Sequence, residues 1–187
     1  MACSSDFGRC SGGNVQSRLS TSERKRRSTA LIFTLATFNV LGITSPVKRD
    51  ELLRDCYYRK IDILAVQETK CRQFEDSVLH FTDDDGKSHK YRFINFQQFD
   101  NKWQAGIGFL VNSVYTNYIK CYNNISDRVA YLDLEIPSKS GKPRLCRVIN
   151  AYGHTQVNCD KYPQRRDYFY KFLSKAVDIP SSWDLYI

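Results

Sequence analysis

The most constraining feature of this 187-residue sequence is a short apolar run that ends abruptly in polar residues. Five of the six residues at positions 61–66 are apolar and most are branched, which is typical of a β-strand buried on both faces. The next four residues, 67–70, read Gln-Glu-Thr-Lys. Polar groups at the end of a buried strand lie where α/β sheets bind their ligands. Glu68 is therefore either a site residue or a surface charge, and the rest of the chain has to decide between them.

Patterns on both sides of this run predict a mixture of strands and helices. Residues 31–39 predict a strand and residues 48–60 a helix, so strand, helix and strand follow one another as in a βαβ-like unit. A second helix is predicted at residues 163–177. The remaining predicted strands are 91–97, 106–112, 114–122, 129–136, 145–151 and one that begins at residue 183. This order favours an α/β or α+β sandwich.

Two polar segments predict turns between these strands. Residues 71–90 are polar and end in Asp83-Asp84-Asp85-Gly86-Lys87, which lacks the spacing and the final glutamate of a calcium-binding EF-hand loop. We therefore interpret that segment as a turn, and we expect another turn at Asn123-Asn124.

Composition indicates one globular domain behind a basic tail. Hydrophobic residues make up 42% and aromatic residues 13% of the chain, which is enough for a packed core in residues 30–187. Residues 1–29 are rich in Ser, Gly, Arg and Thr and predict a disordered basic tail. The tail carries half of the formal charge of +8, and its segment 23–27 is either a nuclear-localisation signal or a solvated charge run. The body is mildly basic, which is compatible with a polyanionic partner.

Cysteine spacing and hydropathy exclude several classes of protein. The seven cysteines include no Cys-x-x-Cys pair, so the sequence indicates neither a zinc site nor a disulfide framework. No apolar run approaches the ~20 residues of a membrane helix, and the N-terminus lacks the apolar segment of a secretory signal. We expect an intracellular protein with reduced thiols, and the basic cluster favours the nucleus.

Three polar side chains follow predicted strands at the point where each strand ends, namely Asn39, Glu68 and Tyr152. Each one alone is more often a turn former, a solvated charge or part of a core. If the three strands are neighbours, an amide, a carboxylate and a phenol converge at one sheet edge. Magnesium typically takes one or two carboxylates plus substrate phosphate, and an amide and a phenol can hold phosphate oxygens. The set therefore suits metal-assisted phosphodiester hydrolysis.

Four segments carry a resemblance to a known superfamily: residues 37–40 (Thr-Phe-Asn-Val), 62–70 (ending Gln-Glu-Thr-Lys), 106–110 (Gly-Ile-Gly-Phe-Leu) and 148–152 (Val-Ile-Asn-Ala-Tyr). In this order and spacing the chain resembles the endonuclease/exonuclease/phosphatase superfamily. Within it, the chain looks most like the apurinic-endonuclease-like domains of non-LTR retrotransposons, including craniofacial development protein 2-like domains.

The resemblance implies a four-layered α/β sandwich that cuts a DNA strand with Mg²⁺, or with Mn²⁺ in its place. By position, Glu68 resembles the metal-ligand glutamate, and Asn39 resembles the asparagine near metal and phosphate. Tyr152 resembles the active-site tyrosine, and Thr155 is compatible with the substrate-binding position that follows it. A superfamily phosphatase or sphingomyelinase would share the fold, but the retroelement branch favours DNA as the substrate.

The sequence also departs from the superfamily pattern. Gly106 and Gly108 match its small-residue strand, whereas His154 replaces a usual proline and is either a solvated loop residue or a general base. The Gly-Asp-Phe-Asn block, with the general-base aspartate, is expected directly after residue 187, and a Ser-Asp-His block later. Since His80 and His89 also lie too early to replace that histidine, residues 30–187 are expected to be the N-terminal portion of the domain, with the C-terminal part missing.

Two functional hypotheses follow. The first is a magnesium-dependent DNA endonuclease of the retroelement nickase type. The second is a truncated derivative that is catalytically weak or inactive and acts as a binding module or has no function. If the second sheet lay mostly in the missing part, one sheet face would be uncovered, which predicts self-association and poor solubility.

Overall fold

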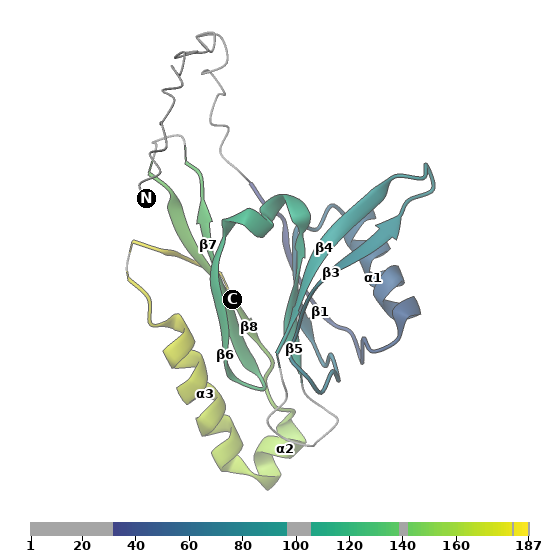
Figure 1. Ribbon diagram of the computed structural model, residues 1–187. Coiled ribbons are helices and arrows are strands. Elements are labelled where there is room, and N and C mark those ends of the chain that lie inside the picture. Colours follow the sequence, from purple (N-terminus) through teal and green to yellow (C-terminus); the bar gives the residue numbers. More distant parts are fainter. Residues whose placement is uncertain (1–31, 97–105, 139–141, 181, 187) are drawn as a thin grey trace, which may run out of the picture.

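Two β-sheets pack face to face, and a helix covers the outer face of each (Figure 1). The computed structural model describes residues 32–96, 106–138, 142–180 and 182–186. The predicted tail, residues 1–29, lies outside the described residues. The order of layers is helix, sheet, sheet, helix, so the predicted four-layered sandwich is confirmed.

The first sheet, sheet A, has the strand order β1-β2-β5-β4-β3. Its strands are β1 (Leu35–Asn39), β2 (Ile63–Gln67), β3 (Glu75–Thr82), β4 (Ser88–Asn95) and β5 (Ile107–Asn112). β1 and β2 run parallel and every other neighbouring pair is antiparallel. The parallel pair results from the helix that connects the two strands, because parallel neighbours need a crossover connection.

The second sheet, sheet B, has the strand order β6-β7-β8-β9. Its strands are β6 (Ile119–Ser126), β7 (Val129–Ile136), β8 (Arg144–Ala151) and β9 (Asp184–Tyr186). β6, β7 and β8 form an antiparallel meander, and β9 lies parallel to β8. The helices are α1 (Pro46–Tyr58), α2 (Gln156–Lys161), α3 (Pro163–Val177) and the short 3₁₀ helix η2 (Ser113–Tyr118).

The main core lies between the two sheets, and smaller cores lie under the helices. Alternation along β2 explains how one strand serves two cores: Ile63 points toward sheet B and Leu64 packs under α1. Every residue of β2 is buried, so the prediction of a strand buried on both faces is confirmed. On the far side, α3 packs over sheet B through Phe169, Leu173 and the fully buried Ala176.

Close packing also explains one glycine of sheet A. A Cβ atom at Gly108 would lie 2.5 Å from the carbonyl oxygen of Ile94 on β4. A side chain there would push β4 away from β5. Gly108 therefore has the structural role that the resemblance implies.

The expectation of an uncovered sheet face is wrong for the described residues. Sheet B comes from this chain and covers the inner face of sheet A, while α1 covers the outer face. What remains open is an edge, because β1 pairs with β2 on one side and with no described strand on the other. The unpaired backbone groups of such an edge are a template for further pairing.

Three other predictions are corrected. The polar segment 71–90 contains the strand β3, whose pattern is alternately exposed and partly buried because it forms the far edge of sheet A. Residues 114–122 are divided between η2 and β6, and Asn123-Asn124 lies inside β6. β6 is an edge strand with irregular register, which tolerates the two asparagines. The six-residue helix α2 was not predicted, because its sequence has no apolar periodicity.

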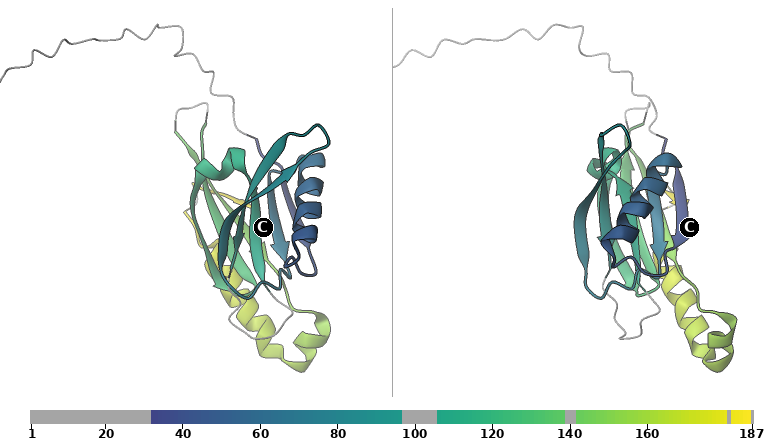
Figure 2. Two further views of the ribbon diagram at one scale, coloured as in Figure 1. Left: turned by 45° about the vertical axis from the view of Figure 1, so that its right-hand side comes forward. Right: turned by 90° about the vertical axis from the view of Figure 1, so that its right-hand side faces the viewer.

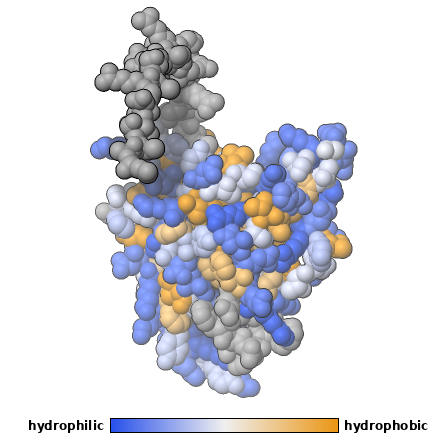
Figure 3. Space-filling view, viewed as in Figure 1, coloured by the Kyte–Doolittle hydropathy of each residue, from blue (hydrophilic) through white to orange (hydrophobic). Residues whose placement is uncertain are grey.

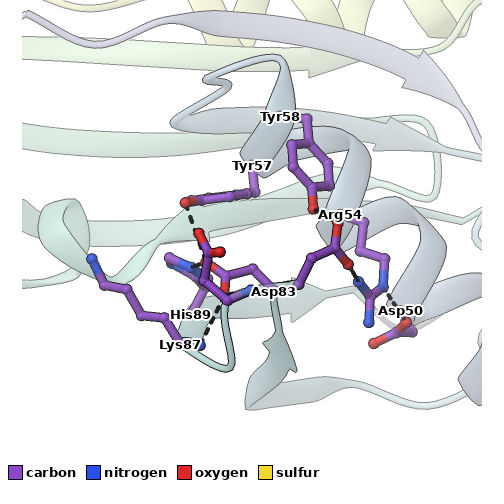
Figure 4. A network of polar contacts seen from close by, with 9 residues as sticks. Asp50, Arg54, Tyr57, Tyr58, Asp83, Lys87 and His89 are labelled. Carbon is purple, nitrogen blue, oxygen red and sulfur yellow. Dashed lines mark hydrogen bonds and ion pairs between the residues drawn. The ribbon is translucent and has the colours of Figure 1, made fainter.

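The turn predicted at Asp83-Asp84-Asp85-Gly86-Lys87 is confirmed as the hairpin between β3 and β4, and polar contacts attach it to α1 (Figure 4). Asp83 Oδ1 accepts hydrogen bonds from the backbone N–H groups of Asp85, at 3.1 Å, and of Lys87, at 2.8 Å. Asp83 Oδ2 lies 2.7 Å from His89 Nε2, and this contact holds the pKa of the Asp83 carboxyl below its usual value. The hydroxyl of Tyr57 on α1 donates to the same oxygen at 3.4 Å.

In the described part of the chain, no helix combines the length and apolar character needed to cross a bilayer.

Candidate active site

The ends of β1, β2 and β8 bring three polar side chains together at one edge of the sandwich. Asn39 is the last residue of β1, Glu68 directly follows β2, and Tyr152 directly follows β8. β1 and β2 are parallel with Asn39 opposite Gln67, so both strands end at the same edge. Tyr152 reaches the same point from sheet B. The structure therefore brings together the three residues that the sequence singled out, and their chemical roles stay predictions.

The Glu68 carboxylate is held through one of its two oxygens. Glu68 Oε1 accepts hydrogen bonds from Asn39 Nδ2, at 2.9 Å, and from the hydroxyl of Tyr152. These bonds, the one from Tyr152 first, hold the pKa of Glu68 below its usual value, and the positive charges of Lys70 and Arg128 lower it further. Among the described residues nothing hydrogen-bonds to Oε2. Glu68 is therefore ionised at neutral pH and keeps one oxygen available for a cation.

The backbone around Glu68 adopts a conformation that side chains other than glycine rarely take. Glu68 has φ of 53° and Lys70 has φ of 56°, both in the left-handed region. Neighbouring backbone groups hold this turn in place: the N–H of Gly42 donates to the carbonyl of Glu68 at 2.7 Å, and the N–H of Thr69 donates to the carbonyl of Gly106 at 3.1 Å. Such strain costs about 1–3 kcal/mol per residue and is characteristic of functional sites.

A buried polar clamp joins the two sheets directly beneath the site. Gln67 Nε2 donates to Asn150 Oδ1 and to Thr37 Oγ1, both at 2.7 Å. Asn150 Nδ2 donates to the carbonyls of Val66 and Gly108, both at 2.9 Å. Gln67 and Asn150 are both buried, so these bonds form away from water. The clamp fixes β8 against β2 and β5, and with them Tyr152 against Glu68.

Sequence reasoning did not find this clamp, although a signal was present. Gln67 ends the apolar strand β2 one residue before Glu68, and Asn150 interrupts the apolar end of β8 two residues before Tyr152. In the alternation of β8, Asn150 shares its face with Val148, which belongs to the core between the sheets. A polar residue on a core-facing position needs a partner, and Gln67 is the matching one.

A cavity of about 460 Å³ opens beside Glu68. Its lining residues are Glu68, Lys70, Arg128, Tyr152, Thr155 and Asn158. The predicted substrate-binding residue Thr155 is thus part of the cavity, whereas Asn39 contacts Glu68 from outside the lining. Two cations and one carboxylate around an open space suit an anion together with a bound cation.

Arg128 and Lys70 were not predicted as site residues. The guanidinium of Arg128 lies 4.8 Å from the ring centroid of Tyr152 and donates to the carbonyl of Gly153 at 3.1 Å. Arg128 follows β6 at the hairpin to β7, far from Tyr152 in sequence, so no local motif signals its place. Lys70 belongs to the Gln-Glu-Thr-Lys segment and could have been included with Glu68.

The residues present fit a magnesium ion in part. Glu68 supplies one carboxylate oxygen, and Mg²⁺ typically keeps several waters and binds through one or two carboxylates plus substrate phosphate. In the described part of the chain, no group of three or more His, Cys, Asp or Glu side chains is placed to hold a metal. A cation at Glu68 would therefore depend on water and on the substrate for most of its coordination.

His154 differs from both interpretations made from the sequence. Its ring is half-buried, which excludes a fully solvated loop residue, and it is not among the residues that line the cavity. Burial lowers the pKa of the imidazole, and the positive charges of Arg128 and Arg165 lower it further. His154 is therefore neutral at neutral pH.

Comparison with known proteins supports the fold. No protein-family model matches the sequence, and no curated protein matches it. The catalytic domain of APE2 from Xenopus laevis superimposes with a TM-score of 0.55 at 13% sequence identity, covering 77% of this chain and 52% of that one. The AP endonuclease LMAP from Leishmania major superimposes with a TM-score of 0.53 at 16% sequence identity, covering 78% of this chain and 47% of that one.

This likeness shows that the chain has a fold like that of these two apurinic-endonuclease structures. Membership of the superfamily that the sequence resembles stays a prediction. The chain spans about half the length of the solved structures that it matches. The retrotransposon branch of the superfamily stays a prediction.

Proposed function

We propose that this chain hydrolyses phosphodiester bonds in DNA with a divalent cation, Mg²⁺ or Mn²⁺, bound at Glu68. The observation that carries the proposal is the state of the Glu68 carboxylate. It is ionised, it is fixed through Oε1, and its Oε2 is unpartnered among the described residues at a cavity with two cationic side chains. The apurinic-endonuclease-like fold supports the same reaction class, and one of the matched structures is named an AP endonuclease.

The polar side chains at and beside Glu68 have separate roles in this proposal. Asn39 and Tyr152 orient Glu68, and their hydrogen bonds keep it ionised. Burial and the contact with Glu68 raise the pKa of the Tyr152 phenol, so it keeps its one proton at neutral pH and goes on donating it to Glu68. Lys70 and Arg128 supply positive charge for the phosphate. When bound, the cation would supply Lewis-acid stabilisation of the charge on the phosphate.

A second function, binding without cleavage, is favoured by one observation. Among the described residues, the cavity lining contains one carboxylate and no histidine, so none of these side chains is suited to take a proton from the attacking water. Losing a general base commonly lowers a rate by about 10²–10⁴-fold. On this alternative the chain is a catalytically weak or inactive derivative that retains DNA binding.

We expect the purified chain to nick supercoiled plasmid DNA in the presence of Mg²⁺, and EDTA to abolish the reaction. Gel electrophoresis follows the conversion to open circles, and fluorescence anisotropy with a labelled duplex measures binding in parallel. Binding without nicking would establish the second function. If the chain neither binds nor nicks DNA, both proposed functions are contradicted.

The finer parts of the proposal concern the type of substrate and the location. A retroelement-type nickase predicts cutting of undamaged plasmid, whereas a repair-type enzyme predicts a preference for duplex that contains an abasic site. The same gel assay on both substrates separates them.

We also propose a nuclear location from the basic cluster at residues 23–27, which lies outside the described residues.

Self-association is proposed through the open edge of β1 instead of through a sheet face. Phe38 of β1 is 55% exposed and Leu41, just after it, is 63% exposed. Two cavities, of about 310 and 180 Å³, lie between β1 and α1, and Phe38 lines both. A second copy that pairs with β1 would bury these side chains together with the unpaired edge.

We expect Phe38→Ser to shift the chain toward monomer in sedimentation velocity. The substitution removes the largest exposed apolar side chain of β1, whereas Val78→Ser is the matched control on β3, the other edge of the same sheet, where Val78 is 53% exposed. Equal effects of the two variants, or a wild-type chain that is monomeric at high concentration, would contradict association through β1.

A further inference from the structure

The corner between α2 and α3 extends the candidate active site with an aromatic ring and two cations. α2 begins directly after the loop that carries Tyr152, and Asn158 of α2 lines the cavity. The backbone N–H of Tyr162 donates to the carbonyl of Asn158 at 3.0 Å, so Tyr162 lies one helical turn, about 6 Å, beyond the cavity lining. Tyr162 ends α2 and precedes α3, which begins at Pro163.

The ring of Tyr162 is exposed and flanked by positive charge. The Arg165 guanidinium lies 4.4 Å, and the Lys161 ammonium 5.5 Å, from the centroid of the ring. Tyr162 is 36% exposed. Cation–π contacts of this kind are worth about 0.5–1 kcal/mol at exposed sites and hold the ring in place. We call these three residues, Lys161, Tyr162 and Arg165, the aromatic corner.

The aromatic corner lies outside the sandwich and on the side of the site. Figure 2 shows α2 and the start of α3 projecting beyond the sheets at the end where β8 leads into α2. In the space-filling view, the coloured atoms at the lower tip of the molecule are mostly hydrophilic (Figure 3). The positive charge of Arg165 also acts on His154, two residues after Tyr152, which places Arg165 near the loop that carries the site.

We propose that the aromatic corner binds an unpaired nucleotide of the DNA strand whose phosphate occupies the cavity, so that Tyr162 stacks on its base. This inference rests on the proposed function for the nature of the ligand. Proteins that hold single strands combine aromatic side chains, on which bases stack, with cationic groups along the backbone. Because Tyr162 lies one helical turn from Asn158 of the cavity lining, the base of a nucleotide next to the bound phosphate would lie within reach of the ring.

The proposal makes the chain selective for DNA structure. A base inside a duplex is stacked on both faces and cannot lie on Tyr162, whereas a single strand, a bubble or a frayed end offers a free face. Stacking on an aromatic side chain is worth about 1–3 kcal/mol per base and tolerates any sequence. The chain should therefore prefer unpaired DNA over a perfect duplex of the same sequence.

Fluorescence anisotropy with a labelled single strand and its duplex, in EDTA, tests the proposal without cleavage. We expect Tyr162→Ala to weaken single-strand binding about tenfold and to leave duplex binding unchanged, because stacking is lost and the charges remain. Tyr162→Phe keeps the ring and should bind as the wild type does. Arg165→Ala should reduce the salt dependence of single-strand binding by about 0.7 in the slope of log K against log salt.

Tyr168→Ala is the matched control, since Tyr168 is 56% exposed on α3 and stacks on Phe172. Equal binding of single strand and duplex by the wild type, or an equal loss in Tyr168→Ala, would overturn the proposal. An unlabelled acidic peptide serves as a competitor for the labelled DNA. If the peptide displaces neither the single strand nor the duplex, the aromatic corner is not a general anion-binding surface. If it displaces the single strand and the duplex equally, base stacking on Tyr162 is contradicted. Because binding is measured in EDTA, the preference for single strands can be observed even if the chain does not nick DNA. The proposal for the aromatic corner and the proposed hydrolysis can therefore fail separately.

Discussion

Glu68→Gln should lower the rate of Mg²⁺-dependent nicking by about 100-fold or more, because a ligand or group on which a site depends commonly contributes at this scale. Glu68 is the one carboxylate among the described residues that line the cavity, and its Oε2 is the oxygen left for a cation. Glutamine keeps the size and the contacts with Asn39 and Tyr152 but removes the negative charge. Initial rates of plasmid nicking, measured against Mg²⁺ concentration, give the comparison.

The matched control is Glu135→Gln, which removes an exposed carboxylate on β7 whose nearest cation is Lys120 at 3.7 Å. This variant should nick as the wild type does. DNA binding in EDTA provides a further readout, because Glu68→Gln removes a negative charge from a cavity that would hold phosphate and should not weaken binding. Nicking by Glu68→Gln at the wild-type rate would refute the assignment of Glu68.

Asn150→Ala should destabilise the fold by about 3 kcal/mol or more. The substitution removes the two buried hydrogen bonds that the carbonyls of Val66 and Gly108 accept from Asn150 in addition to their strand pairing, and it removes one partner of Gln67. Each of the three lost hydrogen bonds costs about 0.5–1.5 kcal/mol, and the lost side-chain volume adds to this. Urea unfolding followed by circular dichroism measures the difference in the free energy of unfolding.

Asn117→Ala, at an exposed position of η2, is the control and should change stability by less than about 0.5 kcal/mol. The double variant Gln67→Ala with Asn150→Ala should cost less than the sum of the two single variants, since the two side chains share one hydrogen bond. Additive costs, or a small cost for Asn150→Ala alone, would show that the clamp does not hold the sheets together.

Elements with strong apolar patterns could be predicted from the sequence, and edge elements could not. β7 and α3 begin and end at the predicted residues, because each alternates or repeats its apolar side chains against a core. β3 was missed and β6 was misplaced because edge strands bury few side chains and leave little pattern. The apolar pattern of a local sequence indicates which residues are buried. Where few residues are buried, as in an edge strand, pairing with the neighbouring strand determines the structure.

The same distinction applies to the candidate site. Asn39, Glu68 and Tyr152 could be predicted because each is the last residue of a strongly patterned strand or directly follows one, and strand ends are where sites form. Arg128 and Asn158 come from a hairpin and from a short helix, and only the packing of sheet B against sheet A brings them to Glu68. The aromatic corner could not be predicted for the same reason, since α2 has no apolar period.

The position of the site between two sheets also has a consequence for how the chain folds. The hydrogen bond from Tyr152 to Glu68 joins residues 84 positions apart, and the clamp joins residues 83 positions apart. Contacts of such long range form slowly, because a large loop has to close before they are gained. Sheet A and the β6–β8 meander can each form through shorter-range pairings, but neither contains a complete site. Ligand binding should therefore appear only in the last kinetic phase of refolding, when the two sheets dock.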